Sequence, residues 1–126
     1  MYTTSDSKEF SFAKRIRSFR FALNGIISFF QEEHNAWIHL FTSFIIVSLI
    51  FIVPCSNTEI IMLVFAMGFV WTAEIFNTAI ERLADLISKE QNLNIKFIKD
   101  LSAAAVLIAA FSALLVGFIV FIPKIF

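Results

Sequence analysis

The hydrophobic and polar positions follow a helical period in the first part of the chain. Between residues 10 and 33, apolar side chains recur at steps of four and three, which places them on one face of a helix. This face consists of Phe12, Ile16, Phe19, Leu23, Ile26 and Phe30. The opposite face consists of Lys14, Arg17, Arg20, Asn24, Ser28 and Gln31. A basic face behind an apolar one predicts an amphipathic helix lying in a membrane interface. The alternative is a helix that packs its apolar face on a soluble core.

Three longer apolar runs follow, and they predict transmembrane helices over residues 36–53, 60–80 and 101–122. Each run is close to the ~17–25 residues needed to cross ~30 Å of hydrocarbon. The stretch "PCSNTE" between the first two predicts a tight hairpin between antiparallel helices. The third helix is expected to stop at Pro123. The pattern therefore predicts an all-α integral membrane protein with a single domain over residues 1–126.

Composition excludes an ordinary soluble domain. Of 126 residues, 59% are hydrophobic, 17 are Phe and 3 are Gly, and the mean hydropathy is +0.83. The formal net charge is zero, so we expect no nucleic-acid partner. Cys55 is the single cysteine, which excludes an intrachain disulfide and a cysteine metal cluster.

Basic residues gather on one side of the predicted spans, before the first and between the second and third. They are Lys14, Arg15, Arg17, Arg20, Arg82, Lys89, Lys96 and Lys99. The hairpin over residues 54–59 has none, and Lys124 follows the third span. By the positive-inside rule, the amphipathic helix and the loop over residues 82–102 are cytoplasmic.

The stretch "WTAEIFNTAIERLAD", residues 71–85, places polar side chains at the end of an apolar run. Glu74, Asn77, Glu81 and Asp85 share one stripe of a helix. A charge facing lipid costs about 2.5–3.5 kcal/mol, so a whole stripe predicts compensation by a cation, a partner side chain or water. The alternative is that the two outermost carboxylates are simply solvated.

Charged residues also stand at the cytoplasmic ends of the other two spans: Glu32 and Glu33 before the first, Lys99 and Asp100 before the third. This convergence predicts a polar pocket at the inner interface. Two carboxylates from different helices can hold Mg²⁺, with waters and phosphates at its other positions. The two histidines lie on different faces of a helix and do not form a metal pair, so we expect interface packing for His34 and His39. Trp37 and Trp71 are typical of an interfacial aromatic belt.

The three glycines, Gly25, Gly68 and Gly117, cannot form either glycine-rich motif that cradles nucleotide phosphates. If ATP binds, its phosphates must be held by Mg²⁺ and by basic residues such as Lys99, Arg17 or Lys14.

The stretches "AEIFNTAIERLADLIS" and "IKDLSAAAVLIAA" resemble the prokaryotic diacylglycerol kinase family. Its signature is E-x-x-N-[ST]-A-I-E, followed downstream by K-D and an Ala-rich span. The stretch "NGIISFFQEEHNAWIH" is similar to the E-x-N-x-x-I-H block of the undecaprenol kinase branch. The resemblance covers residues 12 to 122.

This resemblance implies a homotrimeric kinase in the bacterial inner membrane that transfers the γ-phosphoryl group of MgATP to a lipid hydroxyl on the cytoplasmic side. Glu74 would be the general base and would contact the lipid substrate together with Lys99. Glu33 and Glu81 would bind Mg²⁺. The positions that match nucleotide contacts are Lys14, Arg17, Phe21, Glu33, Asn77, Glu81, Asp85, Glu90, Lys99 and Asp100.

The lipid stays open at this stage. The general family activity favours diacylglycerol, with phosphatidic acid as product, whereas the E-x-N-x-x-I-H block favours undecaprenol. The loop "KEQNLNIKFI" and the order of Ser102 and Ala103 depart from the pattern of many relatives. Two other classes compete: an ion or proton pathway, which predicts carboxylates through the full bilayer depth, and a non-catalytic interfacial scaffold, which leaves the carboxylate stripe unexplained.

Overall fold

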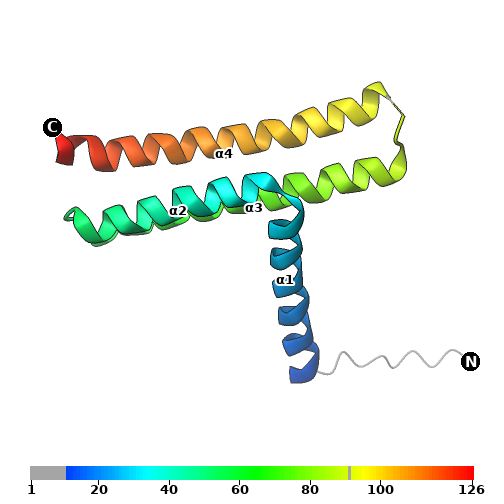
Figure 1. Ribbon diagram of the computed structural model, residues 1–126, viewed down its shortest axis with the longest axis horizontal. Coiled ribbons are helices and arrows are strands. Elements are labelled where there is room, and N and C mark those ends of the chain that lie inside the picture. The colour runs from blue at the N-terminus through cyan, green and yellow to red at the C-terminus, as the bar shows by residue number, and fades with distance from the viewer. Residues whose placement is uncertain (1–10, 91) are drawn as a thin grey trace, which may run out of the picture.

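The computed structural model describes residues 11–90 and 92–126, and the secondary structure of this part is helical. The helices are α1 (Phe12–Glu32), α2 (His34–Ile52), α3 (Asn57–Ile87) and α4 (Leu93–Ile125). Helices α2, α3 and α4 run alongside one another, and α1 projects away from them (Figure 1). The predicted start of the first helix at residue 10 lies outside the described residues.

A single extended residue separates α1 from α2. Glu33, with φ −113° and ψ 115°, ends the first helix and caps the second. Its backbone N–H donates to the Phe29 carbonyl at 3.0 Å, which completes the last turn of α1. The bend at Glu33 therefore sets the direction in which α1 leaves the bundle.

The hairpin between α2 and α3 forms where "PCSNTE" predicts it. Ser56 and Glu59 make a capping box: Ser56 Oγ accepts from the Glu59 N–H at 3.3 Å, and Glu59 Oε2 accepts from the Ser56 N–H at 2.7 Å. Lys124 of α4 lies 3.1 Å from Glu59 Oε1 and donates to the Pro54 carbonyl at 2.9 Å. These contacts join the ends of three helices at the hairpin end of the bundle.

Helices α3 and α4 are longer than the predicted spans. The α3 helix continues seven residues past residue 80, so Glu81 and Asp85 lie on the same rigid element as Glu74. The α2, α3 and α4 helices are each long and apolar enough to cross a membrane. The protein is therefore an integral membrane protein.

The predicted helix end at Pro123 is wrong, because α4 contains this proline and continues to Ile125. Proline lacks a backbone donor and removes one hydrogen bond of the turn. The Phe126 N–H nevertheless donates to the Ile122 carbonyl at 3.2 Å and closes the last turn. The free-energy cost of a proline so near the end of a helix is therefore too small to stop the helix before it.

Tight packing is concentrated between α3 and α4. Leu63, Val120 and Phe121 are buried together, and partly buried side chains surround them. The surrounding residues are Ile46, Leu49, Ile50, Cys55 and Val116. Elsewhere large apolar side chains are exposed, as Phe51 is at 86%. Such a surface is suited to contact with lipid tails or with further helices.

We expect Leu63→Ala to destabilise the protein, because Leu63 is 2% exposed and its truncation leaves a cavity between α3 and α4. The free energy of unfolding is expected to fall by about 2 kcal/mol. Inside a membrane this loss comes mainly from the missing packing contacts, because the side chain is not transferred out of water. Denaturant unfolding in detergent micelles measures the effect. Leu115→Ala is the matched control, because Leu115 on α4 is 58% exposed. Equal stability of the two variants would contradict this account of the core.

Candidate active site

Glu74 is a buried carboxylate on α3, and His39 of α2 is its partner. The distance between His39 Nε2 and Glu74 Oε1 is 2.7 Å. A carboxylate inside an apolar bundle is costly unless a partner satisfies it. The predicted packing role of His39 did not include this hydrogen bond, because the sequence does not show which residue of α3 faces His39.

A second hydrogen bond joins α2 to α3 one turn away. Trp71 Nε1 donates to Ser43 Oγ at 3.0 Å. Ser43 lies four residues after His39 on α2, and Trp71 lies three residues before Glu74 on α3, so each helix presents both groups on one face. The two bonds form a ladder, here called the α2–α3 ladder, which fixes the relative rotation of the two helices.

Aromatic rings connect this ladder to the end of α1. The Trp71 ring lies 6.1 Å from the Phe29 ring and 5.5 Å from the Phe30 ring, measured between centroids. Trp37 contacts Phe30 at 5.4 Å, and its Nε1 donates to the Phe30 carbonyl at 3.0 Å. The two tryptophans thus belong to one cluster at the junction of α1, α2 and α3.

Asn77 and Glu81 continue the polar stripe and are held from α4. Ser102 Oγ lies 2.6 Å from Asn77 Oδ1 and donates to it. Asn77 Nδ2 lies 3.4 Å from Glu81 Oε1 and donates in turn. Ser102 is buried and was not among the predicted site residues. The sequence does contain a signal for Ser102. It is the first polar side chain after Asp100 and stands directly before a run of alanines.

Asp85 is bound to α4 and is not simply solvated. The distance between Lys99 Nζ and Asp85 Oδ1 is 2.6 Å, and Lys99 also lies within the electrostatic influence of Glu81. Asp100, in contrast, pairs with Lys96 one turn back on its own helix. The structure therefore brings Lys99 to the carboxylate stripe and leaves Asp100 on the exposed side of α4.

Glu32 forms an ion pair with Arg82 and so brings the junction of α1 and α2 against α3. Glu33 and Glu81, the two predicted metal ligands, are the sequence neighbours of this pair. No cluster of three or more His, Cys, Asp or Glu side chains suited to a metal forms within residues 11–90 and 92–126. Mg²⁺ needs only one or two carboxylates beside phosphates and waters, so two glutamates fit its donor set.

Besides Asp100, four further predicted nucleotide contacts are not brought to this cluster. Lys14, Arg17 and Phe21 are exposed on α1, which projects from the bundle (Figure 1). Their side chains form no hydrogen bond or ion pair within the part of the chain that the structure describes. Glu90 lies exposed in the connection between α3 and α4, where its backbone N–H donates to Ser88 Oγ at 3.1 Å.

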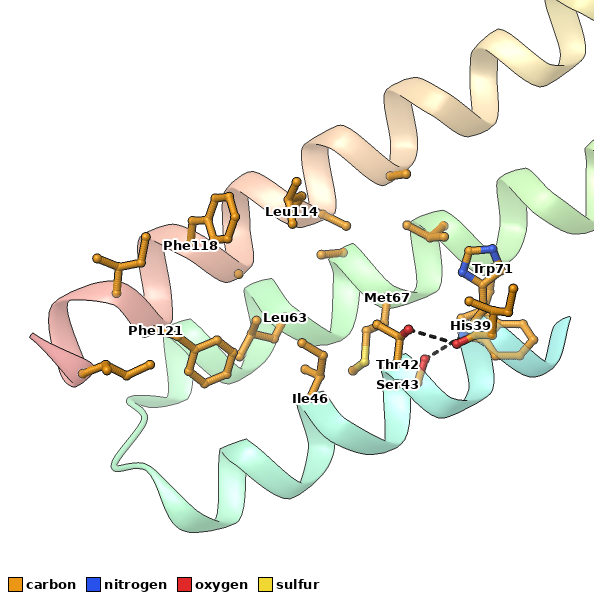
Figure 2. Close-up of a pocket in the computed structure, with 18 residues that line it drawn as sticks. His39, Thr42, Ser43, Ile46, Leu63, Met67, Trp71, Leu114, Phe118 and Phe121 are labelled. Carbon is orange, nitrogen blue, oxygen red and sulfur yellow. Dashed lines mark hydrogen bonds between the residues drawn. The ribbon is translucent and has the colours of Figure 1, made fainter. Parts of the chain in front are cut away.

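An apolar groove of about 530 Å³ runs between α2, α3 and α4. His39, Ser43 and Trp71 lie toward one end of it, and Phe121 lies toward the other (Figure 2). The groove therefore leads from the hairpin end of the bundle to the histidine that contacts Glu74. An apolar molecule with one polar end fits this distribution of side chains.

The chain is similar to known proteins along most of its length. The profile of the family described as prokaryotic diacylglycerol kinase matches residues 20–121. Undecaprenol kinase of Bacillus subtilis (strain 168) is 31% identical over 108 residues, which is 86% of this chain and 88% of the relative. Diacylglycerol kinase of Synechocystis sp. (strain ATCC 27184 / PCC 6803 / Kazusa) is 31% identical over 107 residues, 84% of this chain and 61% of the relative.

These matches and the helical bundle define a membrane-embedded lipid kinase, an enzyme that uses ATP for phosphoryl transfer. The chain belongs to the prokaryotic diacylglycerol kinase family.

We expect Ser102→Ala to lower kcat/KM for ATP roughly tenfold, because it leaves Asn77 Oδ1 without its donor and frees the amide that holds Glu81. Steady-state kinetics in mixed micelles measures this change. Ser112→Ala on the same helix is the control, since Ser112 Oγ donates only to the Ile108 carbonyl of its own helix. Equal kinetics of the two variants would show that Ser102 does not support the site.

Proposed function

We propose that this protein phosphorylates diacylglycerol to phosphatidic acid, using the γ-phosphate of MgATP. The observation that carries the proposal is the buried carboxylate of Glu74, bonded to His39 at the polar end of an apolar groove. A lipid alcohol in this groove would place its hydroxyl near a proton acceptor and its hydrocarbon among apolar side chains.

In the proposed reaction Glu74 is the general base. Its carboxylate accepts the proton of the lipid hydroxyl as the lipid oxygen bonds to the γ-phosphorus of ATP. The bond from this phosphorus to the bridging oxygen breaks, and ADP leaves with the electron pair. Phosphoryl transfer depends mainly on positioning and on charge neutralisation, and the polar stripe on α3 supplies groups for both.

Further residues of the cluster bind the nucleotide in this proposal. Glu33 and Glu81 would hold Mg²⁺, which when bound would neutralise part of the charge of the ATP phosphates. Asn77 and Lys99 orient the phosphates. Asp85 keeps Lys99 on the site side of α4, as their contact suggests. Asp100 contacts the nucleotide from the exposed side of α4.

The proposal includes a homotrimer in the bacterial inner membrane with its sites on the cytoplasmic side. The many exposed apolar side chains on α2, α3 and α4 support further helix contacts. The basic residues of α1 and of the connection between α3 and α4 support the orientation. The α1 helix lies in the interface with its apolar face in the lipid. Lys14, Arg17 and Phe21 of α1 and Glu90 of the connection lie away from the cluster in the single chain and would contact the nucleotide in the assembled trimer.

Undecaprenol is the second candidate acceptor. The Bacillus subtilis relative carries the name undecaprenol kinase, and residues 33–39 match the block found in that branch. Undecaprenol, like diacylglycerol, presents a primary hydroxyl on a large apolar body, so the same groove and the same base suit both.

Transfer of radiolabelled phosphate from ATP to each lipid, measured side by side with purified protein in mixed micelles, tests the proposal. Faster labelling of diacylglycerol supports the main assignment, and faster labelling of undecaprenol assigns the second acceptor. Absence of labelled lipid in both assays, together with ion flux in reconstituted vesicles, would overturn the kinase and support a conducting protein.

We expect Glu74→Gln to lower kcat by about 10²–10⁴-fold, because the amide cannot accept the hydroxyl proton. The variant should retain wild-type assembly in size-exclusion chromatography, since glutamine keeps the shape and one hydrogen-bond acceptor for His39. Near-normal kcat in this variant would remove Glu74 from the mechanism.

We expect Gly117→Leu to raise the KM for the lipid about tenfold and to leave the KM for ATP unchanged, because the new side chain fills the groove. A Cβ at Gly117 meets no atom within 4 Å, so the backbone accommodates the change. Gly68→Leu is the control: its Cβ position is equally open, and it lies outside the groove. Unchanged lipid KM in Gly117→Leu would place the lipid elsewhere.

A further inference from the structure

The two oxygens of the Glu74 carboxylate differ in their surroundings. Oε1 lies 2.7 Å from His39 Nε2, and the side chain is 8% exposed. Oε2 makes no hydrogen bond within the described residues. In the same residues no fully enclosed side-chain oxygen or nitrogen lacks a partner, so Oε2 is not enclosed. One oxygen of the carboxylate is held by His39, and the other is not fully enclosed and has no hydrogen-bond partner among the described residues.

The lysine and arginine side chains near the polar stripe form ion pairs with carboxylates other than Glu74. Lys99 pairs with Asp85, Arg82 pairs with Glu32, and Lys96 pairs with Asp100. Within the described residues no lysine or arginine contacts Glu74, and His39 is the partner that the structure places against it. The orientation of this carboxylate therefore depends on the imidazole.

The His39 ring is itself held in place. It packs edge-on against the Trp71 ring, with 6.2 Å between centroids. Trp71 is fixed in turn by its hydrogen bond to Ser43 and by the ring of Phe29. A hydrogen-bond donor whose own orientation is fixed by packing can hold a reacting group in one geometry.

We propose that His39 is a positioning residue for the general base, an inference that rests on the proposed kinase function. The Nε2–H of His39 donates to Glu74 Oε1 and turns Oε2 toward the acceptor hydroxyl. The hydroxyl proton moves to Oε2 as the lipid oxygen bonds to the γ-phosphorus. The bond between that phosphorus and the bridging oxygen breaks, with its electron pair leaving on ADP. His39 gains and loses no proton in this step.

Kinetics of two His39 variants test the assignment. We expect His39→Leu to lower kcat at least tenfold with the KM for ATP within twofold of wild type. His39→Gln should recover most of this loss, because its amide N–H reaches the same carboxylate oxygen. His34→Leu is the control and should match wild type, since His34 is exposed and its side chain makes no hydrogen bond or ion pair in the described residues. Wild-type kcat in His39→Leu, or an equal loss in His39→Gln, would overturn the proposal.

Nitrogen NMR of ¹⁵N-histidine-labelled protein tests the contact without any enzyme assay. In Glu74→Gln the ring resonances of His39 should shift, while those of His34 stay in place. If the wild-type protein phosphorylates lipid but Glu74→Gln leaves the His39 resonances unchanged, the positioning role alone is overturned. If Glu74→Gln shifts these resonances but the wild-type protein labels no lipid, the proposed function is overturned and the contact stands.

Discussion

The burial of one carboxylate between apolar helices is the constraint on which the site depends. Glu74 can remain in the bundle because His39 on the neighbouring helix bonds to it. This bond requires one rotation of α2 relative to α3, and the hydrogen bond between Trp71 and Ser43 requires the same rotation. The aromatic cluster then joins α1 to this frame, so the position of Glu74 and the path of the chain at Glu33 are set together.

The two ends of the bundle use charge differently. At the hairpin end, Lys124 and Glu59 close the helices against one another, and no predicted site residue lies there. At the other end, ion pairs cross between elements: Glu32 to Arg82 and Lys99 to Asp85. These cross-connections hold three segments around the polar stripe. The polar side chains of the candidate site are therefore concentrated at the end of the bundle opposite the hairpin.

The helical architecture could be predicted largely from the chain, because apolar run length and helical period are local properties. The capping box at Ser56 and Glu59 is visible in the sequence for the same reason. The helix ends were less predictable. The α3 helix passes beyond its apolar run and α4 passes Pro123, because helix continuation depends on local backbone bonds and not on hydrophobicity.

The sequence by itself determined that Glu74, Asn77, Glu81 and Asp85 share one stripe, since a single helix fixes their relative angles. It could not show what faces that stripe. His39, Ser102 and Lys99 come from other helices, and only packing decides which of their atoms meet the carboxylates and the amide. Periodicity acts along one helix, whereas the partners of a buried polar group are chosen by the rotation and depth of its neighbours. Only the tertiary structure specifies these two quantities.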